Sequence, residues 1–171
     1  MQIFFIGPPG CGKSTLAEAV ARRLGFPLQS SGEIARLVAE VDEDWGDVLA
    51  SGNMADRVTM DYLFIRLMAM GPAVFDGYPR YRDQLIDVLT RGKDPIFVWV
   101  DADFELCKER MVQRGRTGED IRARLSTYYR ETKPIVDRFR RGDMQAVHAP
   151  AILAVDPLVR HILREVRERC G

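Results

Sequence analysis

Cysteine and histidine are scarce in this chain. Its 171 residues include only two histidines and three cysteines, Cys11, Cys107 and Cys170. The cysteines are odd in number, lie far apart and form no C-x-x-C pair, which argues against a disulfide framework and against a zinc site. We therefore expect a protein of the reducing cytoplasm.

Net charge and long apolar runs are also missing. Lys plus Arg and Asp plus Glu both number 25, so the formal net charge is zero and no overall field attracts nucleic acid or an anionic membrane. The apolar start, residues 1–6, has no basic flank and is too short for a signal peptide or a membrane span. With 46% hydrophobic residues, the chain is long enough for one buried core. We expect a monomer with a single domain over 1–171, and no contact with nucleic acid or membrane.

Candidate strands and helices alternate along the chain. Apolar runs bounded by turn residues predict strands at 2–6, 26–29, 72–76 and 95–100, and a fifth at either 144–148 or 151–155. Apolar positions at helical spacing and capping signals predict helices at 14–24, from 30 through 36, at 45–50, 57–70, 103–113 and 120–140, and after 156–157. This alternation indicates an α/β fold, a three-layer sandwich with a five-stranded parallel sheet and helices on both faces.

The segment GPPGCGKS, Gly7 to Ser14, fits the pattern GxxxxGK(S/T) and stands between a predicted strand and a predicted helix. Its glycines allow the backbone to wrap round a β-phosphate, and the helix that starts near Lys13 adds the positive end of its dipole. Lys13 would bridge the β- and γ-phosphates, and the Ser14 hydroxyl would bind Mg²⁺. Asp76, at the end of an apolar strand, is placed to hold the metal through water. The motif predicts a P-loop NTPase sandwich that binds ATP and Mg²⁺.

Several separated segments resemble adenylate kinases, within the nucleoside monophosphate kinase family, and the resemblance covers most of the chain. Besides the P-loop, the segment SSGE at 30–33 with Arg36 resembles the family's S-T-G-D…R, and FDGYPR at 75–80 resembles its D-G-F-P-R. The resemblance implies that Arg36 and Arg80 grip the α-phosphate of an acceptor monophosphate, a task that suits the donor fork of guanidinium. The alternative for either arginine is a solvated surface charge.

The acceptor base is predicted from Gln84, which falls where adenylate kinases carry a glutamine. Its amide can both donate to and accept from adenine, whereas UMP/CMP kinases usually carry asparagine there, so the resemblance favours AMP. Ser31 and Glu33 replace the family's usual threonine and aspartate. The segment 52–56 resembles the stretch that lines the adenine, although Met54 is also consistent with an ordinary core residue.

Five arginines surround Gly115 and Gly118, namely Arg110, Arg114, Arg116, Arg122 and Arg124. Such basic density in a neutral protein indicates an anionic ligand nearby. The resemblance implies a short lid at about 114–120 and an acceptor-binding insert at about 30–59. The resemblance also implies that Arg110 would stack on the ATP adenine. Arg114 and Arg116 would reach the ATP phosphates, and Arg124 the transferred group. The alternative, a solvated helix face, suits Arg122 best.

The predicted reaction is direct in-line transfer of the γ-phosphoryl group of ATP to a nucleoside monophosphate, favouring AMP (ATP + AMP = 2 ADP), with Mg²⁺. The predicted catalytic residues are Lys13, Arg80, Arg114 and Arg124. The predicted ATP-binding residues are Gly10, Cys11, Gly12, Lys13, Ser14, Thr15, Arg110 and Arg114. The predicted acceptor-binding residues are Ser31, Gly32, Arg36, Met54, Gly77, Arg80, Gln84 and Arg124, and the metal-binding residues are Ser14 and Asp76.

Two alternatives remain open. One is another small-molecule P-loop kinase, such as a UMP/CMP kinase or a shikimate-type kinase, the latter disfavoured by the DGYPR segment. The other is an ATP-binding scaffold or regulator whose kinase site has decayed. A switch GTPase is disfavoured because the chain has no N-K-x-D motif.

Overall fold

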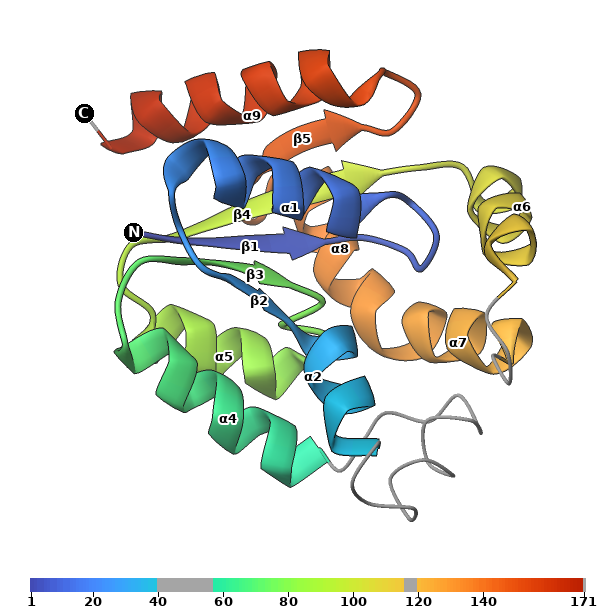
Figure 1. Cartoon of the computed structure of the whole chain (residues 1–171), viewed down its shortest axis with the longest axis horizontal. Helices are drawn as coiled ribbons and strands as arrows, with labels where there is room; N and C mark the ends of the chain where they lie inside the picture. Colours follow the sequence, from blue (N-terminus) through green and yellow to red (C-terminus); the bar gives the residue numbers. More distant parts are fainter. Residues whose placement is uncertain (40–56, 116–119, 171) are drawn as a thin grey trace.

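The computed structural model describes residues 1–39, 57–115 and 120–170 (Figure 1). Within these residues, five parallel strands form one sheet in the order β2-β3-β1-β4-β5. The strands are β1 (Gln2–Ile6), β2 (Leu28–Ser30), β3 (Ala73–Asp76), β4 (Pro95–Asp101) and β5 (Val147–Pro150). Because β1 and β3 are neighbours with Phe5 opposite Asp76, the loops that leave both strands open on the same edge of the sheet.

Helices cover both faces of the sheet. They are α1 (Lys13–Leu24), α2 (Ser31–Ala39), α4 (Arg57–Ala69), α5 (Arg82–Arg91), α6 (Phe104–Arg114), α7 (Ile121–Thr127), the π-helix η1 (Tyr128–Thr132), α8 (Lys133–Arg140) and α9 (Val155–Cys170). Figure 1 shows α1 and α9 on one side of the sheet and α4 and α5 on the other. No helix in the described part of the chain has the length and apolar character needed to cross a membrane.

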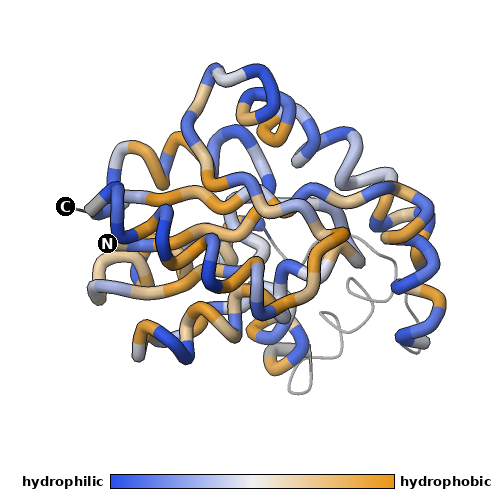
Figure 2. Tube along the Cα trace, turned by 90° about the horizontal axis from the view of Figure 1, so that it is seen from above, coloured by the Kyte–Doolittle hydropathy of each residue, from blue (hydrophilic) through white to orange (hydrophobic). Residues whose placement is uncertain are grey.

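The side chains of the central strand β1 alternate between two cores. Ile3 and Phe5 pack with apolar residues of α1 and α9. Phe4 packs into the second core, where its ring stacks on Phe75 at a centroid distance of 4.6 Å, together with residues of α4, α5 and α8. Figure 2 shows the hydrophobic strands running through the interior between helices that are partly hydrophilic. A sheet buried on both faces explains why its central strands β1, β3 and β4 are nearly continuous apolar runs.

The predicted α/β sandwich is confirmed, although the bounds of some predicted strands and helices differ from those of the structure. The fifth strand, β5, starts at Val147 and overlaps only the end of the candidate segment 144–148. The helix predicted over 120–140 is divided by the π-helix η1. The predicted helix at 45–50 lies outside the described residues, and so do most of the predicted insert (30–59) and lid (114–120). Those two subdivisions stay predictions.

Candidate functional site

The P-loop runs from the end of β1 into α1. Gly10 and Gly12 have φ angles of 82° and 92°, which residues with a Cβ rarely adopt. A Cβ at Gly10 would also collide with the carbonyl oxygen of Cys107 on α6. Glycine is therefore required where the loop passes closest to α6.

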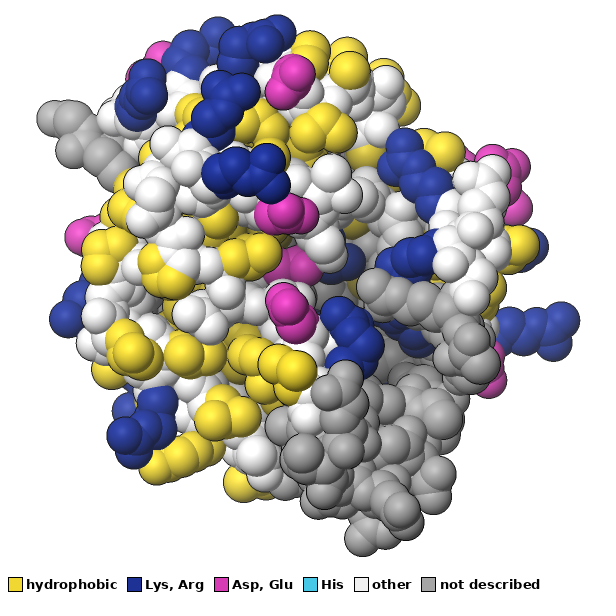
Figure 3. Space-filling view, viewed as in Figure 1, with side chains coloured by type: hydrophobic (Ala, Val, Ile, Leu, Met, Phe, Trp, Pro, Cys, Tyr) yellow, Lys and Arg dark blue, Asp and Glu magenta, His cyan; other side chains and the backbone are white. Residues whose placement is uncertain are grey.

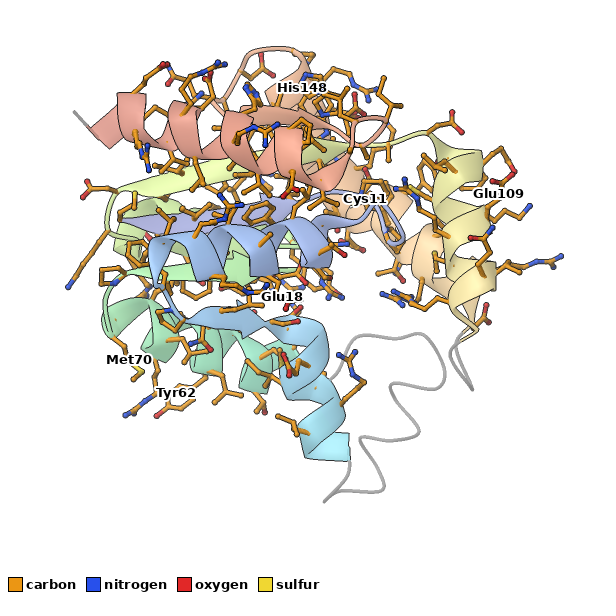
Figure 4. All side chains as sticks on the ribbon, turned by 45° about the horizontal axis from the view of Figure 1, so that its top comes forward. Cys11, Glu18, Tyr62, Met70, Glu109 and His148 are labelled. Atoms are coloured by element: carbon orange, nitrogen blue, oxygen red, sulfur yellow. The ribbon has the colours of Figure 1, made fainter. Side chains whose placement is uncertain are left out.

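Two cations contact the P-loop backbone. Nζ of Lys13 donates a 3.1 Å hydrogen bond to the carbonyl oxygen of Pro8. The guanidinium of Arg110 donates to the carbonyl oxygen of Cys11 at 3.2 Å and to that of Ala151 at 3.4 Å, so it ties the P-loop to the segment after β5. Cys11, labelled in Figure 4 between β1 and α1, is 1% exposed, and burial raises the pKa of its thiol. A buried, protonated thiol is a poor nucleophile.

Ser14, in the first turn of α1, contacts Asp76, the last residue of β3. Oγ of Ser14 donates a 2.6 Å hydrogen bond to Oδ2 of Asp76. Oδ1 of Asp76 is buried and has no hydrogen-bond partner among the described residues. The described part of the chain contains no cluster of three or more His, Cys, Asp or Glu side chains that could hold a metal ion. One hydroxyl and one carboxylate fit Mg²⁺, which keeps several waters and phosphate oxygens in its octahedral shell.

The guanidinium of Arg80 is held in place by neutral oxygens. Nε donates to the carbonyl oxygen of Gly77 at 2.7 Å, and Nη2 donates to Oγ of Ser31 at 2.8 Å. The Ser31 hydroxyl donates in turn to Gly77 at 2.9 Å. Gly77 has a φ of 77°, and a Cβ there would lie against both Ser31 and Arg80. Burial lowers the pKa of Arg80, and the nearby Asp76 carboxylate offsets only part of that effect.

These groups surround one pocket of about 260 Å³. Figure 3 shows Lys and Arg side chains around a hollow on the right of this face, between α1 and α6. The lining residues are Gly10, Gly12, Lys13, Ser14, Thr15, Ser30, Ser31, Gly32, Arg36, Asp76, Gly77, Arg80, Arg110, Arg114 and Arg124, which include six cationic side chains and a single carboxylate. Burial lowers the pKa of Arg114.

Among the described residues, three of these cations have only uncharged acceptors. The oxygens that accept from Lys13, Arg80 and Arg110 are carbonyls or a hydroxyl. Within the described part of the chain, no carboxylate lies within ion-pair distance of the three. Partly buried cations without a counter-charge favour an anion between them. The pocket is therefore suited to a polyanion.

Most of the predicted site residues lie together in this pocket. Cys11 and Gln84 do not line it, and Met54 and Arg116 lie outside the described residues. Ser30 lines the pocket but was not among the predicted site residues. Its position at the end of β2, directly before Ser31, was the signal that would have identified it.

Gln84 lies in the first turn of α5 and is 1% exposed. Its Oε1 accepts from the backbone N–H of Arg80 at 2.7 Å and of Tyr81 at 3.3 Å, and its Nε2 donates to Oδ1 of Asp61 at 2.6 Å. The amide predicted to contact adenine is thus engaged within the protein on both sides. Its contact with the base stays a prediction.

Comparison with known proteins identifies the family. A family model described as an AAA domain matches residues 3–132. Adenylate kinase isoenzyme 1 of Oryctolagus cuniculus is 30% identical over 167 residues, which cover 86% of this chain and 85% of the relative. The chain belongs to the adenylate kinase family. An adenylate kinase of Prochlorococcus marinus is also 30% identical, over 154 residues that cover 82% of this chain and 85% of the relative.

A solved structure supports the fold. A gluconokinase from Sinorhizobium meliloti 1021 superposes with a TM-score of 0.72 at 20% identity, covering 98% of this chain and 91% of that one. The likeness confirms the P-loop sandwich. The adenylate kinase relatives and the matching family model place the chain among the P-loop kinases.

Proposed function

We propose that the protein transfers the γ-phosphoryl group of ATP to a nucleoside monophosphate, with AMP as the favoured acceptor. The observation that carries this proposal is the pocket in which six cationic side chains face a single carboxylate between the P-loop and the DGYPR turn. Such a pocket offers phosphate-binding groups on two sides, as a reaction between two phosphorylated substrates requires. The printed names of the relatives support adenine nucleotides as those substrates.

The donor phosphates belong on the P-loop side. The loop's backbone N–H groups and the start of α1 favour negative charge there. Lys13 lies within the same loop, and its ammonium group donates to the carbonyl oxygen of Pro8. The ammonium group is therefore already close to where the β- and γ-phosphates would bind. Arg110 and Arg114 line the pocket from α6 and neutralise the remaining charge.

Mg²⁺ would be held by Ser14 directly and by Asp76 through water. When bound, Mg²⁺ would neutralise phosphate charge. Asp76 contributes a buried oxygen that has no other partner among the described residues. Ser14 is already oriented by its hydrogen bond to Asp76, so both groups are in place before the nucleotide binds.

The acceptor phosphate belongs on the side of Arg36 and Arg80. Two N–H groups of the Arg80 guanidinium donate to Gly77 and Ser31, which fixes the orientation of the guanidinium at the pocket. Arg124, on α7, would contact the transferred group. Phosphoryl transfer depends mainly on in-line positioning and charge stabilisation, so these residues account for catalysis without a covalent intermediate.

A second candidate is a kinase for another nucleoside monophosphate. The engagement of Gln84 by Arg80, Tyr81 and Asp61 favours it, because an amide held within the protein is less able to distinguish adenine from another base. The pocket and the phosphate chemistry are the same in both candidates, and only the acceptor base differs.

The test is a set of separate reactions with ATP, Mg²⁺ and one of AMP, CMP, UMP, GMP or dTMP, followed by chromatography of the diphosphates. ADP formed fastest with AMP supports the proposal, provided that Lys13→Ala and Arg80→Ala lose activity while the exposed-site control Lys93→Ala keeps it. A faster reaction with another monophosphate supports the second candidate. ATP binding without any transfer contradicts both and supports a scaffold.

A further inference from the structure

The helix that carries Arg124 contains a π-helical turn. The elements α7, η1 and α8 follow one another without a break over residues 121–140 (Figure 1). The backbone N–H of Lys133 donates to the carbonyl oxygen of Tyr128, five residues earlier, which closes the wide ring of the π-turn. One extra residue in a helix rotates the side chains that follow it by about 100° around the axis. The turn therefore decides which element the side chain at its end can reach.

Thr132, the last residue of η1, forms a contact outside its own helix. It is 7% exposed, and its Oγ1 donates a 3.1 Å hydrogen bond to the carbonyl oxygen of Arg80. A threonine hydroxyl inside a helix commonly bonds a carbonyl oxygen three or four residues earlier. The Thr132 hydroxyl instead bonds a residue 52 positions away, in the turn that follows β3. This buried contact joins the helix to the turn of Arg80.

A second observation places η1 beside this turn. Burial raises the pKa of Tyr81, and the neighbouring Glu131 carboxylate raises it further. Tyr81 directly follows Arg80, and Glu131 directly precedes Thr132. Two successive residues of η1 therefore lie against two successive residues of the turn.

The far end of the same helix is anchored in the core. Phe139 of α8 is buried, and its ring centroid lies 5.4 Å from that of Phe97 on β4. Arg124 precedes Thr132 by eight residues, roughly two helical turns. The hydrogen bond to Arg80 therefore lies between the anchored end of the helix and the arginine that lines the pocket.

We propose that Thr132 is a positioning residue that holds the helix of Arg124 against the turn of Arg80, and so fixes the separation of these two arginines across the pocket. Both arginines line that pocket. The inference rests on the proposed function, in which Arg80 binds the acceptor phosphate and Arg124 contacts the transferred group. In-line transfer depends on the relative placement of donor and acceptor. Loss of the Thr132 hydroxyl therefore slows the chemical step, and it affects the binding of each separate substrate much less.

The experiment compares Thr132→Val, which keeps the shape of the side chain but removes its hydroxyl, with Thr132→Ser, which keeps the hydroxyl. Thr90→Val is the matched control, because Thr90 is exposed and its hydroxyl donates to the carbonyl oxygen of Ile86 in its own helix. Single-turnover rates and both KM values are measured with ATP and the acceptor that the wild type uses fastest.

We expect Thr132→Val to lower the single-turnover rate about 10- to 100-fold with little change in either KM. Thr132→Ser should recover most of the rate, and Thr90→Val should match the wild type. An unchanged rate in Thr132→Val, equal rates in Thr132→Val and Thr132→Ser, or a rise in one KM that accounts for the whole loss would overturn the proposal.

A double-mutant cycle separates positioning from a general loss of structure. Thr132→Val is combined with Arg124→Ala, and separately with Arg122→Ala, which removes an exposed arginine of the same helix. When Arg124 is absent, its placement no longer matters, so Thr132→Val should cause little further loss. In the Arg122→Ala background, Thr132→Val should cause its full loss. Equal losses in the two backgrounds would overturn the proposal.

Failure of the proposed function is distinguishable from failure of this inference. If the wild type phosphorylates no monophosphate, the proposed function fails. Calorimetric binding of inorganic tripolyphosphate then tests the inference alone, because a linear polyanion can contact both arginines at once. Weaker binding to Thr132→Val than to both the wild type and Thr132→Ser supports the inference, and any other order of affinities overturns it.

Discussion

The hydroxyl of Ser14 donates a 2.6 Å hydrogen bond to Oδ2 of Asp76 and joins the start of α1 to the end of β3. The second carboxylate oxygen, Oδ1, is buried without a partner among the described residues. An unsatisfied buried acceptor costs roughly 1–3 kcal/mol. A hydrated cation beside Asp76 would relieve this cost, which supports the carboxylate as part of the proposed Mg²⁺ site.

Asp76→Asn should raise the Mg²⁺ concentration that gives half-maximal activity by about 10- to 100-fold, because residues that orient a metal's ligands typically affect its affinity by that factor. The measurement is the initial rate at fixed ATP over a range of Mg²⁺ concentrations. Asp143→Asn, which changes an exposed carboxylate paired with Arg141, should leave the curve unchanged. Superimposable curves for Asp76→Asn and the wild type would contradict the assignment.

Arg124 and Arg122 lie two residues apart on α7 but differ in environment. Arg124 lines the pocket, and Arg122 is exposed. Arg124→Ala should lower kcat by roughly 100-fold, the typical cost of removing one preorganised donor to developing charge, and Arg122→Ala should stay close to the wild type. Single-turnover rates measure the chemical step directly. Equal losses in the two variants would show that helix charge as a whole, and not one guanidinium, is responsible.

Tyr78 is 2% exposed and stacks on Phe64 at a centroid distance of 4.4 Å. Its hydroxyl has no hydrogen-bond partner among the residues described. Tyr78→Phe keeps the stacking and removes the unpaired group, so the free energy of unfolding should rise by about 1 kcal/mol. Urea denaturation measures it. Tyr62→Phe, at an exposed ring on α4 that points outward in Figure 4, should change it by much less. A clear loss of stability in Tyr78→Phe would mean that the hydroxyl is paired.

Burial raises the pKa of Cys107 to about 11, above the value of about 8.5 for a free thiol. The unfolded state therefore loses this proton first as the pH rises. The thiol's contribution is complete below about pH 8.5 and disappears as the pH approaches 11. Over that range, the free energy of unfolding of the wild type should fall by roughly 1–3 kcal/mol more than that of Cys107→Ala. Urea titrations at several pH values under reducing conditions test the slope, and parallel curves would contradict it.

The P-loop could be predicted because eight consecutive residues specify it. The glycines and the flanking strand and helix are local features, and Lys13 and Ser14 follow from the pattern alone. The fifth strand could not be placed in the same way. Val147–Pro150 contains an exposed histidine and a proline, so it has no apolar run, and its position is determined by pairing with β4.

The surroundings of Gln84 were beyond prediction for a different reason. Its partner Asp61 lies 23 residues earlier in the chain, on a helix whose packing against α5 is a tertiary event. Thr132 reaches Arg80 from 52 residues away. A motif identifies which residue type stands at a position, but the contacts that hold it come from elements that the motif does not include.

Gly77, Ser31 and Arg80 share one small volume in which each position limits the others. A side chain at 77 would displace the Ser31 hydroxyl and the Arg80 guanidinium together. One missing Cβ therefore keeps two neighbours in place at the same time. We expect glycine to persist at this position among relatives while the surrounding surface diverges.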